Sequence, residues 1–124
     1  MRVTAFHDPD AALAKVQSDI RMAAERAEQA QRVKAEIDAV RGRGRSPRGE
    51  VVVEVDASGQ LRDVVLTDAA MDLRADVLSG YIVDAARAAQ CEAGARAVAV
   101  MAEAFGEDSP TTQHLRAEVE QRYS

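Results

Sequence analysis

No glycine or proline interrupts residues 10–41, and this stretch constrains the fold more than any other feature of the chain. Asp8 and Pro9 precede it as an N-cap residue followed by proline at the first helical position. Apolar residues then recur every three or four positions, at Leu13, Val16, Ile20, Ala23, Ala27, Ala30 and Ile37. The pattern predicts a helix over about residues 9–39, which at about 1.5 Å per residue is about 45 Å long.

The apolar stripe of this predicted helix is narrow and rich in alanine, as in the seam of a coiled coil. Alanine makes up 25 of the 124 residues, and it buries little area per residue. A core built from it needs closely packed helices. We therefore expect a second copy of the chain to cover the far end of the helix, so that the protein is a homodimer.

Strict alternation of valine with other residues predicts a strand over residues 49–56. Ala57-Ser58-Gly59 is a turn sequence, and it predicts a returning strand over residues 60–67. A two-stranded hairpin alone is only marginally stable, so we expect a third strand over residues 40–46. The tight turn from Ser46 to Gly49 would join it to its neighbour.

A second long helix is predicted over residues 75–105, after a loop around Asp68 to Leu73. Gly80 and Gly94 lie inside it, and each costs about 1 kcal/mol relative to alanine. Close approach of another helix would explain why glycine stands there. Gly106 ends the helix. The prediction is an α+β fold with one domain over residues 1–105 and a C-terminal tail, residues 106–124, that is either a short helix or frayed.

Charge is unevenly distributed along the chain, whose net charge is −5. Residues 1–48 carry a balance of +3, and residues 49–124 carry a balance of −8. Such asymmetry suggests an electrostatic partner. The overall acidity counts against a strong nucleic-acid binder, which is usually a basic domain.

The segment SPRGEVVVEVDASGQLRDVVLTDAAMDLRADVLSGYIVDAARAA, residues 46–89, resembles the actinobacterial form of the YbaB/EbfC nucleoid-associated proteins. The shared features are an S-P-x-G turn, a valine strand, D-A-S-G-x-L, a strand ending in L-T, and a helix with paired alanines. About residues 8–105 align with the family, whereas the tail does not. The resemblance implies a cytoplasmic, nucleoid-associated homodimer that binds DNA with little sequence preference.

Four arginines within eight residues form the candidate DNA-binding site: Arg41, Arg43, Arg45 and Arg48. In the predicted strand, alternation places the first three on one side and Gly42 and Gly44 on the other. Arginine suits phosphate because its planar guanidinium donates two parallel hydrogen bonds. Two other interpretations remain open, namely charges that protect an edge strand from aggregation and a contact with a partner protein.

Three arginines of the first predicted helix, Arg21, Arg26 and Arg32, lie away from the apolar stripe and are assigned to assist DNA binding. Glu25, Glu28 and Glu36 share that outer face. Mixed charges of this kind are also typical of an ordinary solvated helix surface.

No motif indicates an enzyme, a metal site or a cofactor site. His7 and His114 stand alone near the ends of the chain, and Cys91 has no histidine near it in sequence. We expect Cys91, a single cysteine in the middle of a helix, to be a small core residue. The chain also shows no signal-peptide pattern and no apolar stretch long enough for a membrane span.

Two hypotheses for function therefore remain. The first is a dimeric nucleoid-associated protein that neutralises phosphates through the seven arginines named above. The second is a non-enzymatic protein-interaction module that does not bind DNA, because some actinobacterial relatives of YbaB resemble accessory proteins of type VII secretion systems. The balance of −8 over residues 49–124 supports this second hypothesis.

Overall fold

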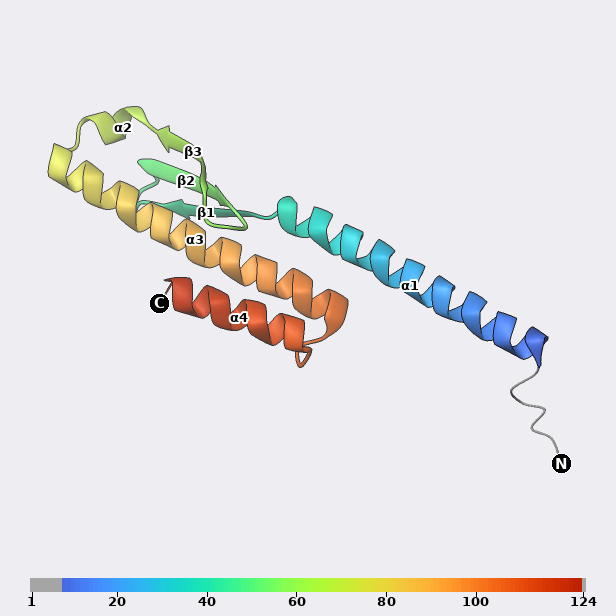
Figure 1. Cartoon of the computed structure of the whole chain (residues 1–124). Helices are drawn as coiled ribbons and strands as arrows, with labels where there is room; N and C mark the ends of the chain where they lie inside the picture. The colour runs from blue at the N-terminus through green and yellow to red at the C-terminus, as the bar shows by residue number, and fades with distance from the viewer. Residues whose placement is uncertain (1–7, 124) are drawn as a thin grey trace. The chain divides into compact units, whose positions relative to one another are not determined.

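The computed structural model describes residues 8–123, and the chain divides after Arg32 into two compact units that are described separately. The elements follow in the order α1, β1, β2, β3, α2, α3, α4 (Figure 1). Helices and one antiparallel sheet thus form separate segments of the chain, and the predicted α+β class is confirmed. Residues 1–7 of the predicted domain, including His7, lie outside the described residues.

α1 spans Pro9–Asp38, close to its predicted range. The carboxylate of Asp8 accepts hydrogen bonds from the backbone N–H groups of Asp10 and Ala11, at 3.0 and 3.2 Å, and so acts as the predicted N-cap. The apolar stripe is exposed: Leu13, Val16 and Ile20 are 56, 52 and 63% accessible. Val33 is the one residue of α1 that is buried.

The three strands form an antiparallel meander in the order β1-β2-β3 (Figure 1). They are β1 (Arg41–Arg45), β2 (Val51–Asp56) and β3 (Leu61–Leu66). Gly49 and Gly59 occupy the two turns with φ of 75° and 85°, a conformation that side chains strongly disfavour. The predicted third strand and both turns are therefore present.

α3 (Ala75–Phe105) packs on one face of the sheet, above all against β1 and β2 (Figure 1). Val51, Val53 and Val55 of β2 point toward it and are fully buried. On the helix side the buried residues are small, namely Ala85, Ala89 and Ala93. Small side chains on the helix allow the backbones of helix and sheet to come close.

Gly42 and Gly44 bring β1 closest to α3. A Cβ on Gly42 would lie 2.1 Å from the carbonyl oxygen of Ala89, and one on Gly44 would lie 1.9 Å from that of Ala85. Only glycine fits at these two positions. Their alternation with arginine is thus explained by helix packing on the buried side of the strand.

The chain between β3 and α3 holds α2 (Asp68–Met71), a single helical turn, where the sequence predicted only a loop. The prediction was wrong because the turn carries one buried apolar residue, Ala70, instead of an amphipathic pattern. Its backbone closes locally, since the N–H of Ala70 donates to Thr67 O and that of Asp72 donates to Ala69 O.

α4 (Pro110–Tyr123) packs against α3, so the described part of the tail is helical and not frayed (Figure 1). The hydroxyl of Ser109 accepts from the N–H of Thr112 at 3.1 Å, which satisfies a free donor of the first turn. Val119 covers Gly94, where a Cβ would lie 2.6 Å from the valine Cγ1. Close approach of another helix therefore explains Gly94, whereas a Cβ on Gly80 would meet nothing within 4 Å.

Candidate nucleic-acid interface

β1 presents its arginines on the side of the sheet that faces away from α3. Gly42 and Gly44 are buried, whereas Arg43 and Arg45 are exposed and Arg41 is half-buried. Arg48 is exposed in the adjoining turn. The structure therefore brings these four residues together along one edge strand and its turn.

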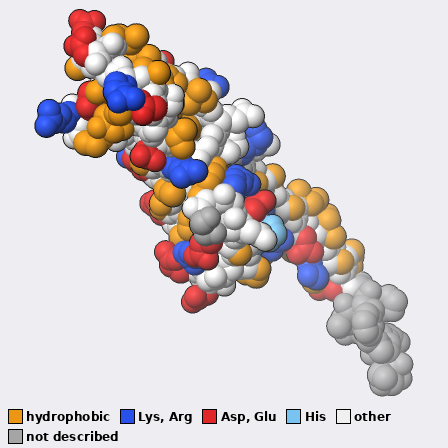
Figure 2. Space-filling view, turned by 90° about the vertical axis from the view of Figure 1, so that its left-hand side faces the viewer, with side chains coloured by type: hydrophobic (Ala, Val, Ile, Leu, Met, Phe, Trp, Pro, Cys, Tyr) orange, Lys and Arg blue, Asp and Glu red, His pale blue; other side chains and the backbone are white. Residues whose placement is uncertain are grey.

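The register of the sheet sets carboxylates beside two of these arginines. Arg41 is paired with Asp56, and Arg43 with Glu54, which in turn lies opposite Asp63 of β3. The Nε of Arg43 lies 2.9 Å from Oε1 of Glu54. This outer face of the sheet therefore carries mixed charge, and Figure 2 likewise shows positive and negative side chains interspersed over one face of the molecule.

The sequence prediction missed these three carboxylates as neighbours of the arginines. The length of the turn between β1 and β2 would, however, have predicted which residues of the two strands lie opposite each other. Because Arg45 is paired with Val52 across that turn, counting outward places Arg43 opposite Glu54 and Arg41 opposite Asp56.

Arg41 has a local structural contact at the end of α1. One of its guanidinium nitrogens, Nη1, donates to the carbonyl oxygens of Asp38 and Val40, at 3.0 and 2.7 Å. The last carbonyls of a helix lack partners within the helix and attract positive charge. Arg41 thus stabilises the C-terminus of α1 and offers fewer donors to a ligand.

Arg45 and Arg48 form what we call the basic turn. Both side chains are exposed, and neither makes an ion pair with any residue between 8 and 123. The guanidinium of Arg45 lies along the turn, with Nη2 3.2 Å from the position that a Cβ on Gly49 would occupy. Of the four clustered arginines, these two have the most donors available for phosphate.

A buried polar cluster fixes the backbone of the basic turn. Oε1 of Glu50 accepts hydrogen bonds from the Ser46 hydroxyl at 2.8 Å and from the Arg48 N–H at 2.9 Å. The Ser46 hydroxyl oxygen also accepts from the N–H of Val51 at 2.9 Å. The backbone N–H of Glu50 itself, followed by the Ser46 hydroxyl, holds the pKa of the Glu50 carboxyl below its usual value.

Arg21, Arg26 and Arg32 are exposed on α1, in the first of the two units. Within residues 8–123 none of the three makes an ion pair. Their spacing at about 100° per residue sets Arg21 and Arg32 on one side of the helix with Glu25 and Glu28 between them. These arginines thus add positive charge to a helix surface that also carries carboxylates.

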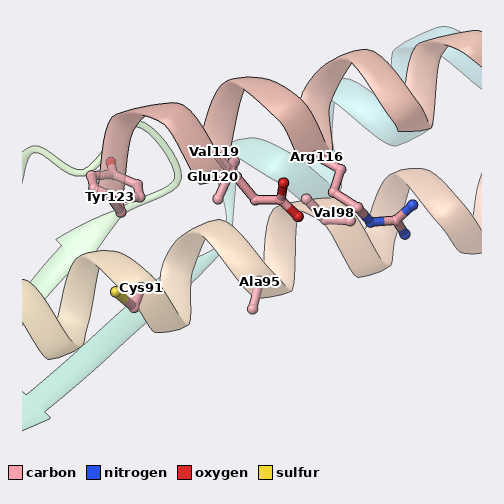
Figure 3. A pocket seen from close by; sticks show the side chains of 7 residues that line it. All are labelled: Cys91, Ala95, Val98, Arg116, Val119, Glu120 and Tyr123. Carbon is pink, nitrogen blue, oxygen red and sulfur yellow. The ribbon is translucent and has the colours of Figure 1, made fainter.

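A hollow with a volume of about 450 Å³ lies between α3 and α4. Its lining is mostly apolar, with Arg116 and Glu120 contributing charge (Figure 3). Cys91 lines it and is exposed, so the expectation that it is a core residue was wrong. The reason is that Cys91 lies beside this hollow and not among the α3 residues that face the sheet, Ala85, Ala89 and Ala93.

Groups that bind metal do not cluster in the part of the chain that the structure describes, where no three His, Cys, Asp or Glu side chains are suitably placed. His114 is exposed on α4. Among the described helices, none is both long and apolar enough to cross a membrane.

The family model of the YbaB/EbfC DNA-binding family matches residues 13–108, which is most of the chain. The chain therefore belongs to this family, and the resemblance in its motifs is confirmed. The match ends before α4 begins. A search of curated proteins found no match.

Proposed function

We propose that this member of the YbaB/EbfC DNA-binding family is a non-enzymatic, nucleoid-associated homodimer that binds duplex DNA through arginine–phosphate contacts with little sequence preference. The observation that carries the proposal is the basic turn, where Arg45 and Arg48 are exposed and make no ion pair within residues 8–123, on a backbone held by Glu50. Arg21, Arg26 and Arg32 on α1 add further phosphate contacts. Arg41 and Arg43 contribute less, because each already has a partner.

A homodimer is supported by exposed apolar side chains on α1 and on the sheet. In β3, Leu61, Val65 and Leu66 are between 42 and 61% accessible. The register sets Val65 beside Val52 on the outer face of the sheet, whereas Leu61 and Leu66 lie on the side that faces α3. Apolar groups are thus left exposed on both sides of this edge strand, which supports an interface with a second copy. Two copies also present the basic turn twice, which strengthens binding through effective concentration.

Fluorescence anisotropy of a short labelled duplex, measured over a salt series, tests the proposal. We expect the affinity of the wild type to fall steeply with salt, and the double variant Arg45→Ala/Arg48→Ala to flatten the logarithmic slope by about 0.9 for each phosphate that it no longer neutralises. The matched control is Arg116→Ala/Arg122→Ala, which removes the same charge from α4, where both arginines already pair with glutamates. Equal losses of affinity in the two double variants would reject the basic turn as the DNA-binding site.

A protein-interaction scaffold is the second candidate function. The observation in its favour is the row of carboxylates beside the arginines, Glu54, Asp56 and Asp63, which repels a duplex lying across the sheet. If the wild type fails to bind DNA even at low salt, DNA binding is rejected. Enrichment of one protein partner in a nuclease-treated pull-down then supports the scaffold.

A further inference from the structure

The hollow between α3 and α4 is bounded on the α3 side by short side chains. Cys91, Ala95 and Val98 follow one another at spacings of four and three residues, so they lie along one side of the helix. Cys91 and Ala95 are both exposed. Because these two side chains are short, they leave space between the helices that a larger residue would fill.

α4 supplies the other wall of this hollow with Val119 and Tyr123 (Figure 3). The volume of about 450 Å³ lies within the range of about 300–1,000 Å³ found for small-molecule sites. Most of the lining is apolar, so an aliphatic group that enters the hollow removes apolar surface from water. The hollow therefore suits the hydrocarbon part of a ligand.

A second hollow, also of about 450 Å³, adjoins the first, because Cys91 and Tyr123 line both. The other residues that line it are polar, namely Arg87, Gln90 and Arg122. Arg87 lies one turn before Cys91 on α3, and Arg122 precedes Tyr123 on α4. Each helix thus contributes one arginine to the same polar hollow.

Both of these arginines have donors available for an anion. Arg87 is exposed and makes no ion pair within residues 8–123. Nη2 of Arg122 lies 3.7 Å from Oε1 of Glu118, which is longer than a hydrogen bond. An anionic group in the polar hollow therefore meets two guanidinium groups that are not already engaged by a close carboxylate.

The carboxylates near the apolar hollow determine which way round an anionic molecule binds. Glu120 lines this hollow, and in Figure 3 its carboxylate points toward the end where Arg116 lies. Arg116 is already paired with Glu107. An anionic group is thus repelled from that end and attracted to the opposite end, where Arg87 and Arg122 lie.

We propose that the two adjoining hollows form a binding site for a single-chain aliphatic anion, with its carboxylate between Arg87 and Arg122 and its hydrocarbon chain along Cys91 and Ala95. This site is separate from the basic turn and goes beyond the proposed function. Half of it comes from α4, which begins after the family match ends at residue 108. A free molecule is chosen over an anionic membrane surface because the net charge of −5 opposes approach to such a surface, whereas a single carboxylate meets the two arginines locally.

Decanoate, a saturated aliphatic carboxylate, is the probe, and isothermal titration calorimetry on the full chain measures its dissociation constant. We expect saturable binding, and we expect Arg87→Ala/Arg122→Ala to weaken it by about tenfold or more because charge-assisted hydrogen bonds are lost. The matched control Arg62→Ala/Arg74→Ala removes the same charge from exposed positions that line neither hollow, and it leaves the constant unchanged. Decanol has the same chain without the charge, and we expect it to bind about tenfold more weakly or worse.

Cys91 reports where the probe binds, because it is the one cysteine of the chain and lines both hollows. We expect bound decanoate to slow the alkylation of its thiol by iodoacetamide, with a midpoint at the calorimetric dissociation constant. Ala95→Leu directs a larger side chain toward Cys91, since helical side chains point to the N-terminus, and it abolishes binding without changing the helical circular dichroism spectrum. Ala88→Leu makes the same change at an exposed position of α3 that lines neither hollow, and binding persists.

Three results would each overturn the inference: no saturable binding of decanoate, equal affinity for decanol, or unchanged alkylation of Cys91 when decanoate is bound. Vesicles of anionic phospholipid distinguish the other source of the same chemistry. A protein that sediments with these vesicles and does not bind decanoate has a membrane-binding surface at the hollows, and this result also overturns the inference.

Discussion

The two sides of strand β1 differ in what each can tolerate. On one side Gly42 and Gly44 contact the backbone of α3, so that no larger side chain fits. On the other side Arg43 and Arg45 extend into solvent. Alternation thus gives one five-residue strand two separate tasks, with packing on the glycine side and charge on the arginine side. The comparison teaches that a repeated Arg-Gly sequence need not indicate a flexible arm.

Gly44→Ala is expected to have the largest effect on the free energy of unfolding. The new Cβ would lie 1.9 Å from the carbonyl oxygen of Ala85, so the helix and the strand have to move apart. We expect a loss of about 3 kcal/mol or more, measured by urea denaturation. Arg45→Ala, one residue away on the other side, is the control and changes stability by about 0.5 kcal/mol or less. Similar losses of unfolding free energy in the two variants would contradict the conclusion that only the glycine side of β1 is intolerant of a larger side chain.

Glu50→Gln is expected to have an intermediate effect that depends on pH. The pKa of the Glu50 carboxyl lies below its usual value of 4.5 in the folded chain, so the ionised form stabilises the fold above that pH. This stability is lost as pH falls through the folded pKa. The variant therefore has a lower free energy of unfolding than the wild type at pH 7. The difference between the two proteins becomes smaller at about pH 3, where Glu50 of the wild type is increasingly protonated.

Denaturation curves of both proteins at the two pH values provide the measurement. Asp56 also has a lowered pKa, caused first by the Ser58 hydroxyl, but it is present in both proteins and cancels in the difference. If the difference in the free energy of unfolding between the two proteins is the same at both pH values, ionisation of Glu50 does not stabilise the turn.

Arg43→Ala is expected to lower the free energy of unfolding by about 1 kcal/mol or less, because its ion pair with Glu54 is exposed. If the basic turn is the phosphate contact, the affinity for DNA also falls less than in Arg45→Ala. Thermal denaturation and duplex titration of the two single variants give the comparison. A larger loss of DNA affinity in Arg43→Ala than in Arg45→Ala would indicate that the phosphate contact lies on the face of the sheet and not at the basic turn.

Much of the fold was predictable because its signals are local. Valine alternation in residues 51–56, the long stretch from Pro9 without glycine, and the turn glycines each depend on a few neighbouring residues. α2 was missed because a single turn of helix has no period to detect. The exposure of Cys91 was missed because it depends on how α4 packs against α3, which the local sequence pattern does not specify.

The candidate site was predictable only in part. The positions of Arg45 and Arg48 follow from the strand and its turn, and both are exposed as expected. The hydrogen bonds of Arg41 to Asp38 O and Val40 O depend on the path of the backbone, which residue types alone do not specify. The pair between Arg43 and Glu54 required a register, and therefore a turn length counted in advance.

The close packing of Gly42 and Gly44 against α3 also affects the entropy change when a ligand binds to β1. A backbone held between a helix and a neighbouring strand has little freedom left to lose when a ligand arrives. Association at the arginine side of β1 therefore restricts side-chain rotamers, at about 0.5–1.5 kcal/mol for each long side chain, and leaves the main chain as it was. A disordered arginine-rich arm would have to order its backbone as well.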